Sequence, residues 1–534
     1  MPFGTAHTDT FVLDRMPARA DMPDLLFNLP ELQFPDRLNC AAGLLGTRVA
    51  AGWGDRPCLI TAQDTWSYAD LWARSCQIAH VLVEDLNIQP GNRVMLIGFN
   101  GTMLVASWYA AMLAGAVAVI IVPKATSYEL KSYADRTQPA VVLHDHRVSE
   151  RVDEAGSGLA ASRRLAWGTG AAAGLEAAMG SKPTTFDAVD TDATDPCLLA
   201  FTSGSGGRPK LVVHTHRDIL AVNSLFAGSV LNPNESDIFT GSPPLGFTFG
   251  LMALACYPIA VGASVVLLER AGPPELADAI EDYGVTVCFT APTTYRTWLR
   301  DDVAPRLKSL RIAISSGESL GGGDWRAYKD TIGLDVVNVL GSTEMLHACM
   351  STARFIARPG SIGRPIRGYE AKIVDLSGHE VTDGAVGLLA VRGPTGCKYL
   401  DDSRQREQVR GGWTFTGDLA RRDADGFYWF EGRSDAMIIT AGRNVSPSEV
   451  EGVLLEHPDV VECAVISIPD RIRSSRIKAV VVTRDGFPTG EIGVRLLKKF
   501  VMEKIETYKC PQVIVFVPEL PRTLTGKIAR HALE

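Results

Sequence analysis

Residues 196–214 decide the fold, and they read Pro-Cys-Leu-Leu-Ala-Phe-Thr-Ser-Gly-Ser-Gly-Gly-Arg-Pro-Lys-Leu-Val-Val-His. Two apolar runs, Pro196–Phe201 and Leu211–His214, are typical of β-strands. The loop between them is rich in glycine and hydroxyl side chains and ends in Lys210. Glycine lets backbone N–H groups approach phosphate oxygens, and the hydroxyls and the lysine add donors. The stretch therefore predicts a polyphosphate-binding loop between two strands.

This loop is not a Walker P-loop, whose Gly-Lys-Ser/Thr sequence opens a helix. Lys210 instead follows a proline and precedes Leu211 in a strand-like run. A Gly/Ser surface turn is the other interpretation, because such clusters are common between strands. The loop alone leaves both interpretations open.

The bulk composition limits the class of protein. A chain of 534 residues is too long for one core, so we expect at least two domains. A hydrophobic content of 46% and a charged content of 21% are ordinary for a globular enzyme. The net charge of −8 implies no broad basic field, so nucleic acid and anionic membranes are not expected partners.

The cysteines and the N-terminus indicate the compartment. The ten cysteines are scattered and none has C-x-x-C spacing, which favours buried free thiols over disulfides or zinc ligands. The N-terminus lacks a basic region followed by an apolar run, so we expect no signal peptide. Both observations predict a cytoplasmic protein.

The first α/β unit lies near residues 55–150. Thr102–Val122 is uncharged over about the width of a bilayer, but a glycine divides it into a helix-like half and a β-branched half. Strand-like runs precede it at Val94–Phe99 and follow it at Ala140–Leu143. This β-α-β-α-β pattern predicts a buried parallel sheet and no membrane span.

The rest of the chain divides by texture. Asp153–Thr185 is rich in alanine and glycine, and we expect a surface excursion without chemistry. From Cys197 the α/β alternation resumes, and after about Ala371 shorter polar strands predict a small β-rich subdomain. Past Gly432 a smaller α+β unit is expected, with a helix that begins at Pro447. Strand candidates elsewhere are Ser264–Leu268, Val285–Phe289, Arg311–Ser315, Val460–Ile468, Ile477–Thr483 and Val513–Val517, and a helix is expected near Ile492–Ile505.

Four further segments place polar side chains beside glycine turns. They are Gly341-Ser342-Thr343-Glu344, Trp413–Asp418, Gly432-Arg433-Ser434-Asp435 and Pro521–Ile528, which contains Lys527. Each alone is typical of an ordinary turn or an exposed loop. In this order and spacing, together with the loop at 202–210, they resemble the adenylate-forming superfamily of acyl-CoA synthetases, nonribosomal adenylation domains and luciferases. The resemblance covers roughly residues 55–534.

The resemblance implies that these segments bind ATP and Mg²⁺. The residues implied in ATP or AMP binding are Thr202, Ser203, Gly204, Ser205, Gly207, Lys210, Asn338, Gly341, Ser342, Asp418 and Arg433. Thr343 is implied as the α-phosphate contact and Glu344 as the Mg²⁺ ligand, which suits a hard cation. Lys527 is implied to stabilise charge during adenylation.

The same resemblance implies two domains and a rotation between them. We expect a large α/β domain over residues 1–434, built from stacked α/β units plus the β-rich subdomain, and a smaller mobile α+β domain over 435–534. Asp435 is the implied hinge. After adenylation, the loop with Ala441 and Gly442 would face the CoA channel, and Lys509 is a candidate contact for CoA phosphates.

The implied acyl pocket favours an aromatic acid. Its expected lining is Phe247, Thr248, Gly317, His347 and Ala348. Residues 241–255 contain no aspartate that could pair with an α-ammonium group, whereas phenylalanines suit a flat or apolar acid. The run at 341–347 resembles benzoate-type CoA ligases, and the segments at 11–15, 29–32 and 35–39 resemble 2-aminobenzoate-CoA ligases.

We therefore expect an AMP-forming aryl-CoA ligase that uses ATP, Mg²⁺ and CoA. Anthranilate is the first expected substrate and benzoate the second. A stand-alone enzyme that loads an aryl acid onto a separate carrier protein stays open, because Gln512 stands where related ligases often carry a basic residue. A fatty-acyl-CoA ligase is a further alternative. Both a monomer and a homodimer fit the sequence.

Overall fold

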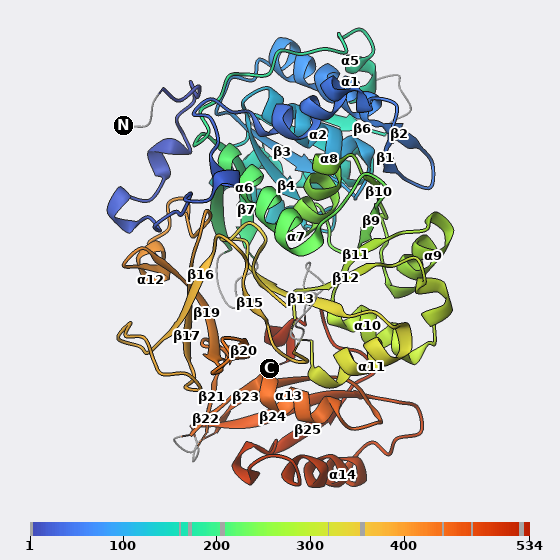
Figure 1. Cartoon of the computed structure of the whole chain (residues 1–534), viewed down its shortest axis with the longest axis vertical. Helices are drawn as coiled ribbons and strands as arrows, with labels where there is room; N and C mark the ends of the chain where they lie inside the picture. Colours follow the sequence, from blue (N-terminus) through green and yellow to red (C-terminus); the bar gives the residue numbers. More distant parts are fainter. Residues whose placement is uncertain are drawn as a thin grey trace.

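The computed structural model describes residues 4–159, 162–168, 174–202, 209–318, 320–352, 358–440, 443–470, 474–522 and 528–533. A large α/β N-terminal part carries a small β-rich subdomain and is followed by a smaller α+β C-terminal part. The C-terminal part forms the lower layer in Figure 1, below the two large sheets. This architecture confirms the fold class predicted from the sequence.

One six-stranded sheet is built around the β-α-β-α-β run near the N-terminus. Its strands in spatial order are β6 (Arg163–Trp167), β5 (Val141–Asp145), β3 (Arg93–Ile97), β4 (Val117–Ile121), β7 (Pro196–Thr202) and β8 (Lys210–Thr215). All neighbours are parallel except β7 and β8, which are antiparallel and set Thr202 opposite Lys210. β3, β4 and β5 are buried along their whole length, which explains their continuous apolar runs.

The long uncharged segment folds as two elements. Helix α2 (Thr102–Leu113) ends before a glycine with φ 67°, and β4 follows. Ten of the twelve residues of α2 are buried, because the helix packs between the two large sheets. No helix within the described part of the chain is long and apolar enough to cross a bilayer.

The expectation for Asp153–Thr185 was wrong in one respect. This stretch contributes β6, which pairs in parallel with β5 at the edge of the sheet. The strand reads Arg-Arg-Leu-Ala-Trp, and only Trp167 is fully buried. An edge strand is half exposed and tolerates charge, so it lacks the apolar run by which its buried neighbours are recognised.

The second large sheet has nine strands. In spatial order they are β15 (Arg364–Pro365), β14 (Ala348–Ser351), β13 (Val336–Gly341), β12 (Ile312–Ser315), β11 (Val287–Thr290), β9 (Ile238–Gly241), β10 (Ser264–Val266), β1 (Pro57–Ile60) and β2 (Thr65–Ser67). The strands from β13 to β1 are parallel. Helices α9 (Pro273–Tyr283), α10 (Pro292–Arg300) and α11 (Gly322–Ile332) pack on one face. On the other face lies the largest core, which this sheet shares with the six-stranded sheet and with helices such as α1 (Tyr68–His80), α2 and α6 (His216–Phe226).

Two smaller units complete the chain. The β-rich subdomain is an antiparallel sheet of β16 (Glu370–Val374), β17 (Gly387–Arg392), β18 (Val409–Arg410), β19 (Trp413–Arg422) and β20 (Tyr428–Arg433). The C-terminal part contains β21 (Ile438–Thr440), β22 (Arg443–Val445), α13 (Pro447–Leu455), β23 (Val460–Asp470), β24 (Ser474–Thr483), α14 (Glu491–Met502) and β25 (Val513–Phe516). It has a core of its own, from Ile438 to Ile514. The helix at Pro447 and the strands and helix expected after it are confirmed.

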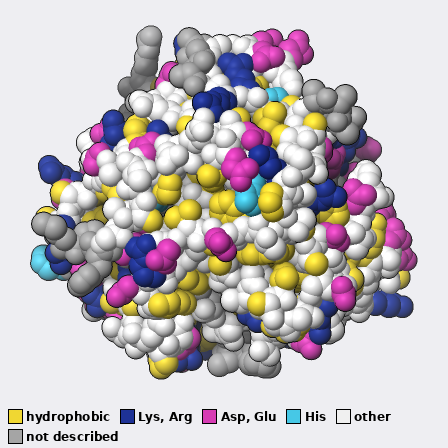
Figure 2. All heavy atoms as spheres, turned by 90° about the horizontal axis from the view of Figure 1, so that it is seen from above, with side chains coloured by type: hydrophobic (Ala, Val, Ile, Leu, Met, Phe, Trp, Pro, Cys, Tyr) yellow, Lys and Arg dark blue, Asp and Glu magenta, His cyan; other side chains and the backbone are white. Residues whose placement is uncertain are grey.

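The surface and the cysteines agree with the composition. On the face drawn in Figure 2, side chains of both charge signs alternate with apolar ones, and no single-sign field covers that face. All ten cysteines are buried and free, as predicted. Three sulfur or imidazole groups meet in the core, where Cys40, Cys197 and His216 lie with their ligand atoms within 4.8 Å of one another.

Candidate active site

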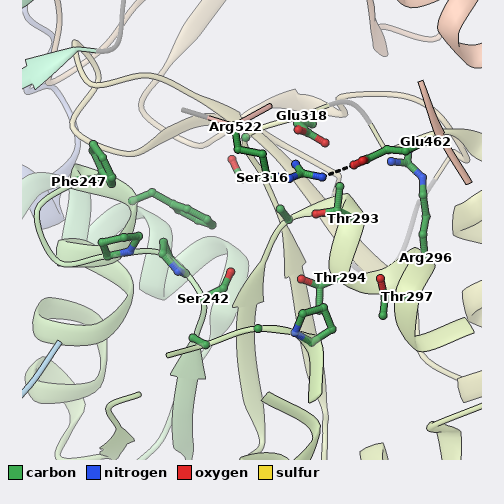
Figure 3. Close-up of a pocket in the computed structure, with 18 of the residues that line it drawn as sticks. Ser242, Phe247, Thr293, Thr294, Arg296, Thr297, Ser316, Glu318, Glu462 and Arg522 are labelled. Carbon is green, nitrogen blue, oxygen red and sulfur yellow. Dashed lines mark hydrogen bonds and ion pairs between the residues drawn. The ribbon is translucent and has the colours of Figure 1, made fainter. Parts of the chain in front are cut away.

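The carboxyl ends of parallel strands from both large sheets meet at one cleft of 1440 Å³. Several residues one or two positions after these strands line it: Phe99 after β3, Val122 after β4, Ser242 after β9, Ala291 after β11 and Ser316 after β12. Ligands of open α/β sheets bind at this edge. Glu462 and Arg522 of the C-terminal part form an ion pair on the opposite wall, as Figure 3 shows. The cleft therefore lies between the two parts of the chain.

A tight turn from Ser342 to His347 connects β13 to β14 at the cleft. Ser342 N–H donates to the His347 carbonyl at 3.1 Å, and Leu346 N–H donates to the Thr343 carbonyl at 3.0 Å. Leu346 has a left-handed backbone with φ 66°. A Cβ on Gly341 would fall 2.0 Å from the His347 carbonyl oxygen, so only glycine fits there. Both Thr343 and His347 line the cleft.

Glu344 and Lys210 are brought together by a tyrosine. Tyr399 OH donates to Glu344 Oε1, and Lys210 Nζ donates to Tyr399 OH at 3.0 Å. Burial and the neighbouring Glu344 carboxylate both raise the pKa of Tyr399, so the phenol stays a donor at neutral pH. Two predicted site residues from distant segments therefore share one polar cluster.

His347 lies in a box of aromatic rings. Its ring centroid is 4.6 Å from that of Phe226, 5.2 Å from Tyr257, 5.3 Å from Phe249 and 6.2 Å from Phe289. The residue is only 3% exposed, and burial lowers the pKa of His347 to about 3, so the ring is neutral at pH 7. Neither ring nitrogen has a hydrogen-bond partner among the described residues.

The other residues predicted for the acyl pocket line the same cleft. Thr248 and Ala348 are buried, Phe247 is half-buried, and Gly317 is exposed with φ 92°. In Figure 3, Phe247 lies at the left edge of the pocket, above and apart from Ser242. The structure thus brings together all five residues predicted for this pocket.

Asp418 and Arg433 pair across neighbouring strands. Arg433 Nη1 lies 2.9 Å from Asp418 Oδ1, and its Nε lies 3.3 Å from Asp435 Oδ1. Burial alone would lower the pKa of Arg433, but the two carboxylates raise it above its usual value. Gln408 connects this sheet to the first cluster, because its Nε2 donates to a carbonyl of β19 and its Oε1 lies 3.4 Å from Lys210 Nζ.

The remaining predicted contacts are distributed as follows. Asn338 is buried, and its Nδ2 donates to the Ser361 carbonyl at 3.0 Å. Lys509 does not line the cleft; its Nζ donates to Glu449 Oε1 at 2.6 Å and lies 3.3 Å from Glu506 Oε2. Seven predicted residues lie outside the described residues: Ser203, Gly204, Ser205, Gly207, Ala441, Gly442 and Lys527.

Two family models match the chain. The model described as "AMP-binding enzyme" matches residues 47–398, and the model described as "AMP-binding enzyme C-terminal domain" matches residues 449–527. The chain belongs to the AMP-binding enzyme family. The resemblance to adenylate-forming enzymes is thereby confirmed, and the cleft lies where the two matched regions face each other.

Relatives within this family include aryl-CoA ligases. The benzoate–CoA ligase of Thauera aromatica is 30% identical over 511 residues, which cover 94% of this chain and 97% of the relative. The crystal structure of the anthranilate CoA ligase AuaEII with anthranoyl-AMP has a TM-score of 0.89 and 31% identity, and the match covers 95% of this chain and 98% of that one. A benzoate CoA ligase structure from Burkholderia xenovorans LB400 has a TM-score of 0.85 and 29% identity, covering 93% and 99% of the two chains.

Sequence reasoning missed part of the site. Tyr399 reaches Glu344 only because its segment pairs with β8 through a bridge from Val212. Phe226 and Tyr257 form two walls of the aromatic box, yet they look like ordinary core residues of α6 and α8 (Tyr257–Val261). No local pattern in the sequence marks these positions.

Proposed function

We propose that this enzyme is an AMP-forming aryl-acid–CoA ligase with anthranilate as its preferred acid and benzoate as the second. The carboxylate oxygen of the acid attacks the α-phosphate of ATP, the α–β phosphoanhydride bond breaks, and pyrophosphate leaves. The thiol of CoA then attacks the acyl carbon and releases AMP. Family membership and the relatives named above support the reaction class.

One observation carries the proposed substrate. A neutral imidazole offers one N–H donor and one acceptor nitrogen, and both of those of His347 lack partners among the described residues, as does the buried hydroxyl of the neighbouring Tyr257. Unsatisfied buried polar groups are rare in folded proteins and call for an explanation. An aromatic acid in the cleft would lie with its ring beside Phe249 and His347, which both line it, and a ring amino group would supply a hydrogen bond to the imidazole. This favours anthranilate over benzoate and over a fatty acid.

The residues around the turn supply the electrostatics of the first step. Both reactants are anions, so donors and cations must offset their repulsion. We propose that Thr343 contacts the α-phosphate and that Lys210, beside Tyr399, contacts the outer phosphates. The other proposed contacts in this loop are Thr202, Ser203, Gly204, Ser205 and Gly207. Lys527 is proposed to stabilise the charge that develops during adenylation. Gly341 and Ser342 are proposed to contact AMP.

The donor set at Glu344 fits a divalent cation. Tyr399 occupies Oε1 of this carboxylate, and oxygen ligands beside phosphate suit Mg²⁺. When bound there, Mg²⁺ would neutralise phosphate charge. Glu344 is the proposed ligand, and Tyr399 orients its carboxylate.

The nucleoside and the domain arrangement follow from the second cluster. We propose that Asp418 binds the ribose hydroxyls, that Arg433 binds the ribose or a phosphate, and that Asn338 binds the adenine amino group. The proposed domains are residues 1–434 and 435–534, with the hinge at Asp435. Rotation about this hinge would bring Ala441 and Gly442 to the CoA channel.

The position of Lys509 leaves a carrier protein as a second candidate acceptor of the aryl group. Its ammonium is held by Glu449 and Glu506 and does not line the cleft, so this lysine offers little to CoA phosphates in the arrangement described. That observation favours an enzyme that loads the aryl group onto a separate carrier protein. We rank this second because the relatives named above are CoA ligases.

The test is substrate-dependent pyrophosphate release with anthranilate, benzoate and octanoate, followed by mass spectrometry of the products with CoA. We expect anthranilate to be fastest and anthraniloyl-CoA to form. Pyrophosphate release without thioester would support the carrier-protein alternative. A preference for octanoate over both aromatic acids would contradict the proposal.

A further inference from the structure

A buried histidine lies against the Ser342–His347 turn without lining the cleft. His214 on β8 is fully buried, and its Nε2 lies 2.8 Å from the Thr343 carbonyl oxygen. A carbonyl can only accept, so Nε2 carries the proton and donates. Thr343 therefore receives two hydrogen bonds on one oxygen, because Leu346 N–H also donates to it at 3.0 Å.

The other side of the imidazole faces a buried ion pair. His214 Nδ1 lies 3.8 Å from Asp218 Oδ2, and the same carboxylate oxygen accepts from Lys398 Nζ. The side chains of His214, Asp218 and Lys398 are at most 3% exposed. Burial alone would raise the pKa of Asp218, but the Lys398 charge lowers it below its usual range. A buried ion pair is weak evidence for stability, because desolvation offsets the attraction. At 3.8 Å the contact of Nδ1 with Asp218 is longer than a hydrogen bond, and Nδ1 has no hydrogen-bond partner among the described residues, so the ion pair confines the imidazole by packing.

The turn needs such support because its backbone is strained. Leu346 has φ 66°, a conformation that is costly for a residue with a Cβ. Strained residues persist when the surrounding structure over-determines them. The carbonyl that closes the turn onto Leu346 is the one that His214 holds.

The segment of Lys398 and Tyr399 supports the turn at a second point. Val213 N–H donates to the Lys398 carbonyl at 2.9 Å, which fixes this segment to β8. From there Lys398 reaches Asp218, and the next residue, Tyr399, reaches Glu344. Two adjacent side chains thus reach the turn. Tyr399 does so directly, through Glu344, and Lys398 does so through Asp218, which packs against His214.

We propose that His214, packed against the Asp218–Lys398 ion pair, is a positioning residue that fixes the Ser342–His347 turn through its hydrogen bond to the Thr343 carbonyl. Its hydrogen bond sets Thr343 and Glu344, the proposed contacts for phosphate and Mg²⁺, and His347, the proposed contact for the acid, relative to one another. His214 touches no substrate. The roles of Thr343, Glu344 and His347 rest on the proposed function, whereas the support that His214 gives to the turn does not.

The test compares two substitutions at one position. His214→Leu removes the donor, whereas His214→Gln keeps an N–H donor at a similar reach. His144→Leu is the matched control, since His144 is a buried histidine on β5 whose ring nitrogen contacts the Asp145 carbonyl and not the turn. The readouts are amide hydrogen exchange of the peptide spanning 341–347 in ligand-free protein, the Mg²⁺ concentration for half-maximal pyrophosphate exchange, and kcat and KM with the best acid.

We expect His214→Leu to speed exchange of the turn, raise the half-maximal Mg²⁺ concentration and lower kcat about 10- to 100-fold, since small misplacements near reacting atoms cost this much. His214→Gln should recover most of each loss, and His144→Leu should leave all three readouts near wild type. The proposal is overturned if turn exchange is unchanged in His214→Leu, or if His214→Gln is as impaired as His214→Leu. If His214→Leu does not fold, His214→Asn, whose amide is too short to reach Thr343, takes its place against His214→Gln. Turn exchange needs no substrate, so it separates failure of this proposal from failure of the proposed function.

Discussion

At residue 347 the chain buries a polar ring that no described residue satisfies. Leaving a buried donor or acceptor unpaired costs about 1–3 kcal/mol. Four aromatic neighbours hold the ring in place, so it cannot turn towards solvent. A ligand that pairs with His347 recovers this cost, and a ligand that lacks the group does not. Discrimination between acids is therefore expected to reside largely in this one side chain.

Replacing His347 by Phe tests that expectation. We expect His347→Phe to lower kcat/KM for anthranilate about 10- to 100-fold, because the lost hydrogen bond lies in a dry pocket. The value for benzoate should change less than about threefold, because the apolar shape is kept. Initial rates of pyrophosphate release at several acid concentrations give both values. Phe249→Leu changes a neighbouring residue of the box and should lower kcat/KM for both acids to a similar extent. Equal losses for both acids in His347→Phe would contradict the specificity role.

The low pKa of His347 also makes the fold sensitive to acid. The group titrates near its ordinary value of 6.5 when unfolded and near about 3 when folded. Between these values the unfolded chain binds a proton that the folded chain does not, so stability falls as the pH drops below about 6.5. The contribution of this residue is about 1 kcal/mol per pH unit in that window. Thermal unfolding from pH 7.5 to pH 4.5 should show a shallower decline for His347→Phe than for wild type, and parallel curves would refute the assignment.

Some site residues could be predicted from the sequence and others could not, for a physical reason. Glu344 and Lys210 stand in short glycine-containing segments whose order along the chain identifies the family. Tyr399, which joins them, is marked by no such motif, and its contact depends on the pairing of its segment with β8. Long-range strand pairing is not encoded in any short window of sequence, so a residue whose role depends on it stays invisible until the fold is known.

At the scale of elements, burial on both faces is what made strands recognisable. β3 and β4 read as apolar runs and were predicted, whereas β6 carries two arginines at the sheet edge and was missed. The sequence identified the turn between β13 and β14 by its glycine, but it did not reveal what constrains the turn. That constraint is steric, since the chain at Gly341 passes against the His347 carbonyl.

Gly341→Ala tests the constraint on the turn. Its Cβ would lie 2.0 Å from the His347 carbonyl oxygen and 2.7 Å from the Ala348 Cα, so the backbone must move. We expect a loss of about tenfold or more in kcat for pyrophosphate exchange, because Thr343 and His347 shift together. Gly323→Ala is the matched control. That glycine lies in α11 with nothing within 4 Å of its added Cβ, so the change should raise stability by about 0.5–1 kcal/mol and leave kcat unchanged. Wild-type kinetics in Gly341→Ala would contradict the model of a rigid turn.

At the scale of the molecule, the junction between the two parts is polar. The hydroxyls of Ser446 and Ser448 donate to the Glu431 carbonyl, next to the proposed hinge. Beyond it, Arg530 pairs with Glu451, and the charge of Glu318 in the large part helps to raise the pKa of Arg530. Polar interfaces of this kind permit relative motion more readily than apolar ones. The arrangement therefore suits the proposed rotation of the C-terminal part between the two half-reactions.

Lys527→Ala tests the two half-reactions separately. We expect adenylation, followed by pyrophosphate exchange, to fall about 100-fold or more, because one cation is lost where charge develops. Thioester formation from premade anthraniloyl-AMP and CoA should be largely spared. Lys509→Ala is the control on the same domain, since that lysine pairs with Glu449 and should leave adenylation intact. An equal loss in both half-reactions of Lys527→Ala would rule out the rotation.

Because every cysteine is buried, the native enzyme should react little with thiol reagents. Burial raises the pKa of nine of the ten thiols and shields all ten from solvent. Maleimide dyes should therefore not label the native chain. Tyr128 and Leu496 are 82% and 45% exposed. Tyr128 lies in α3 (Ser127–Thr137) of the large part, and Leu496 lies in α14 of the C-terminal part. A Tyr128→Cys/Leu496→Cys double variant would then accept a fluorophore pair at these two points alone. A change in energy transfer between the dyes on adding ATP, the acid and CoA would reveal the proposed rotation of the C-terminal part in real time, with no background labelling to subtract.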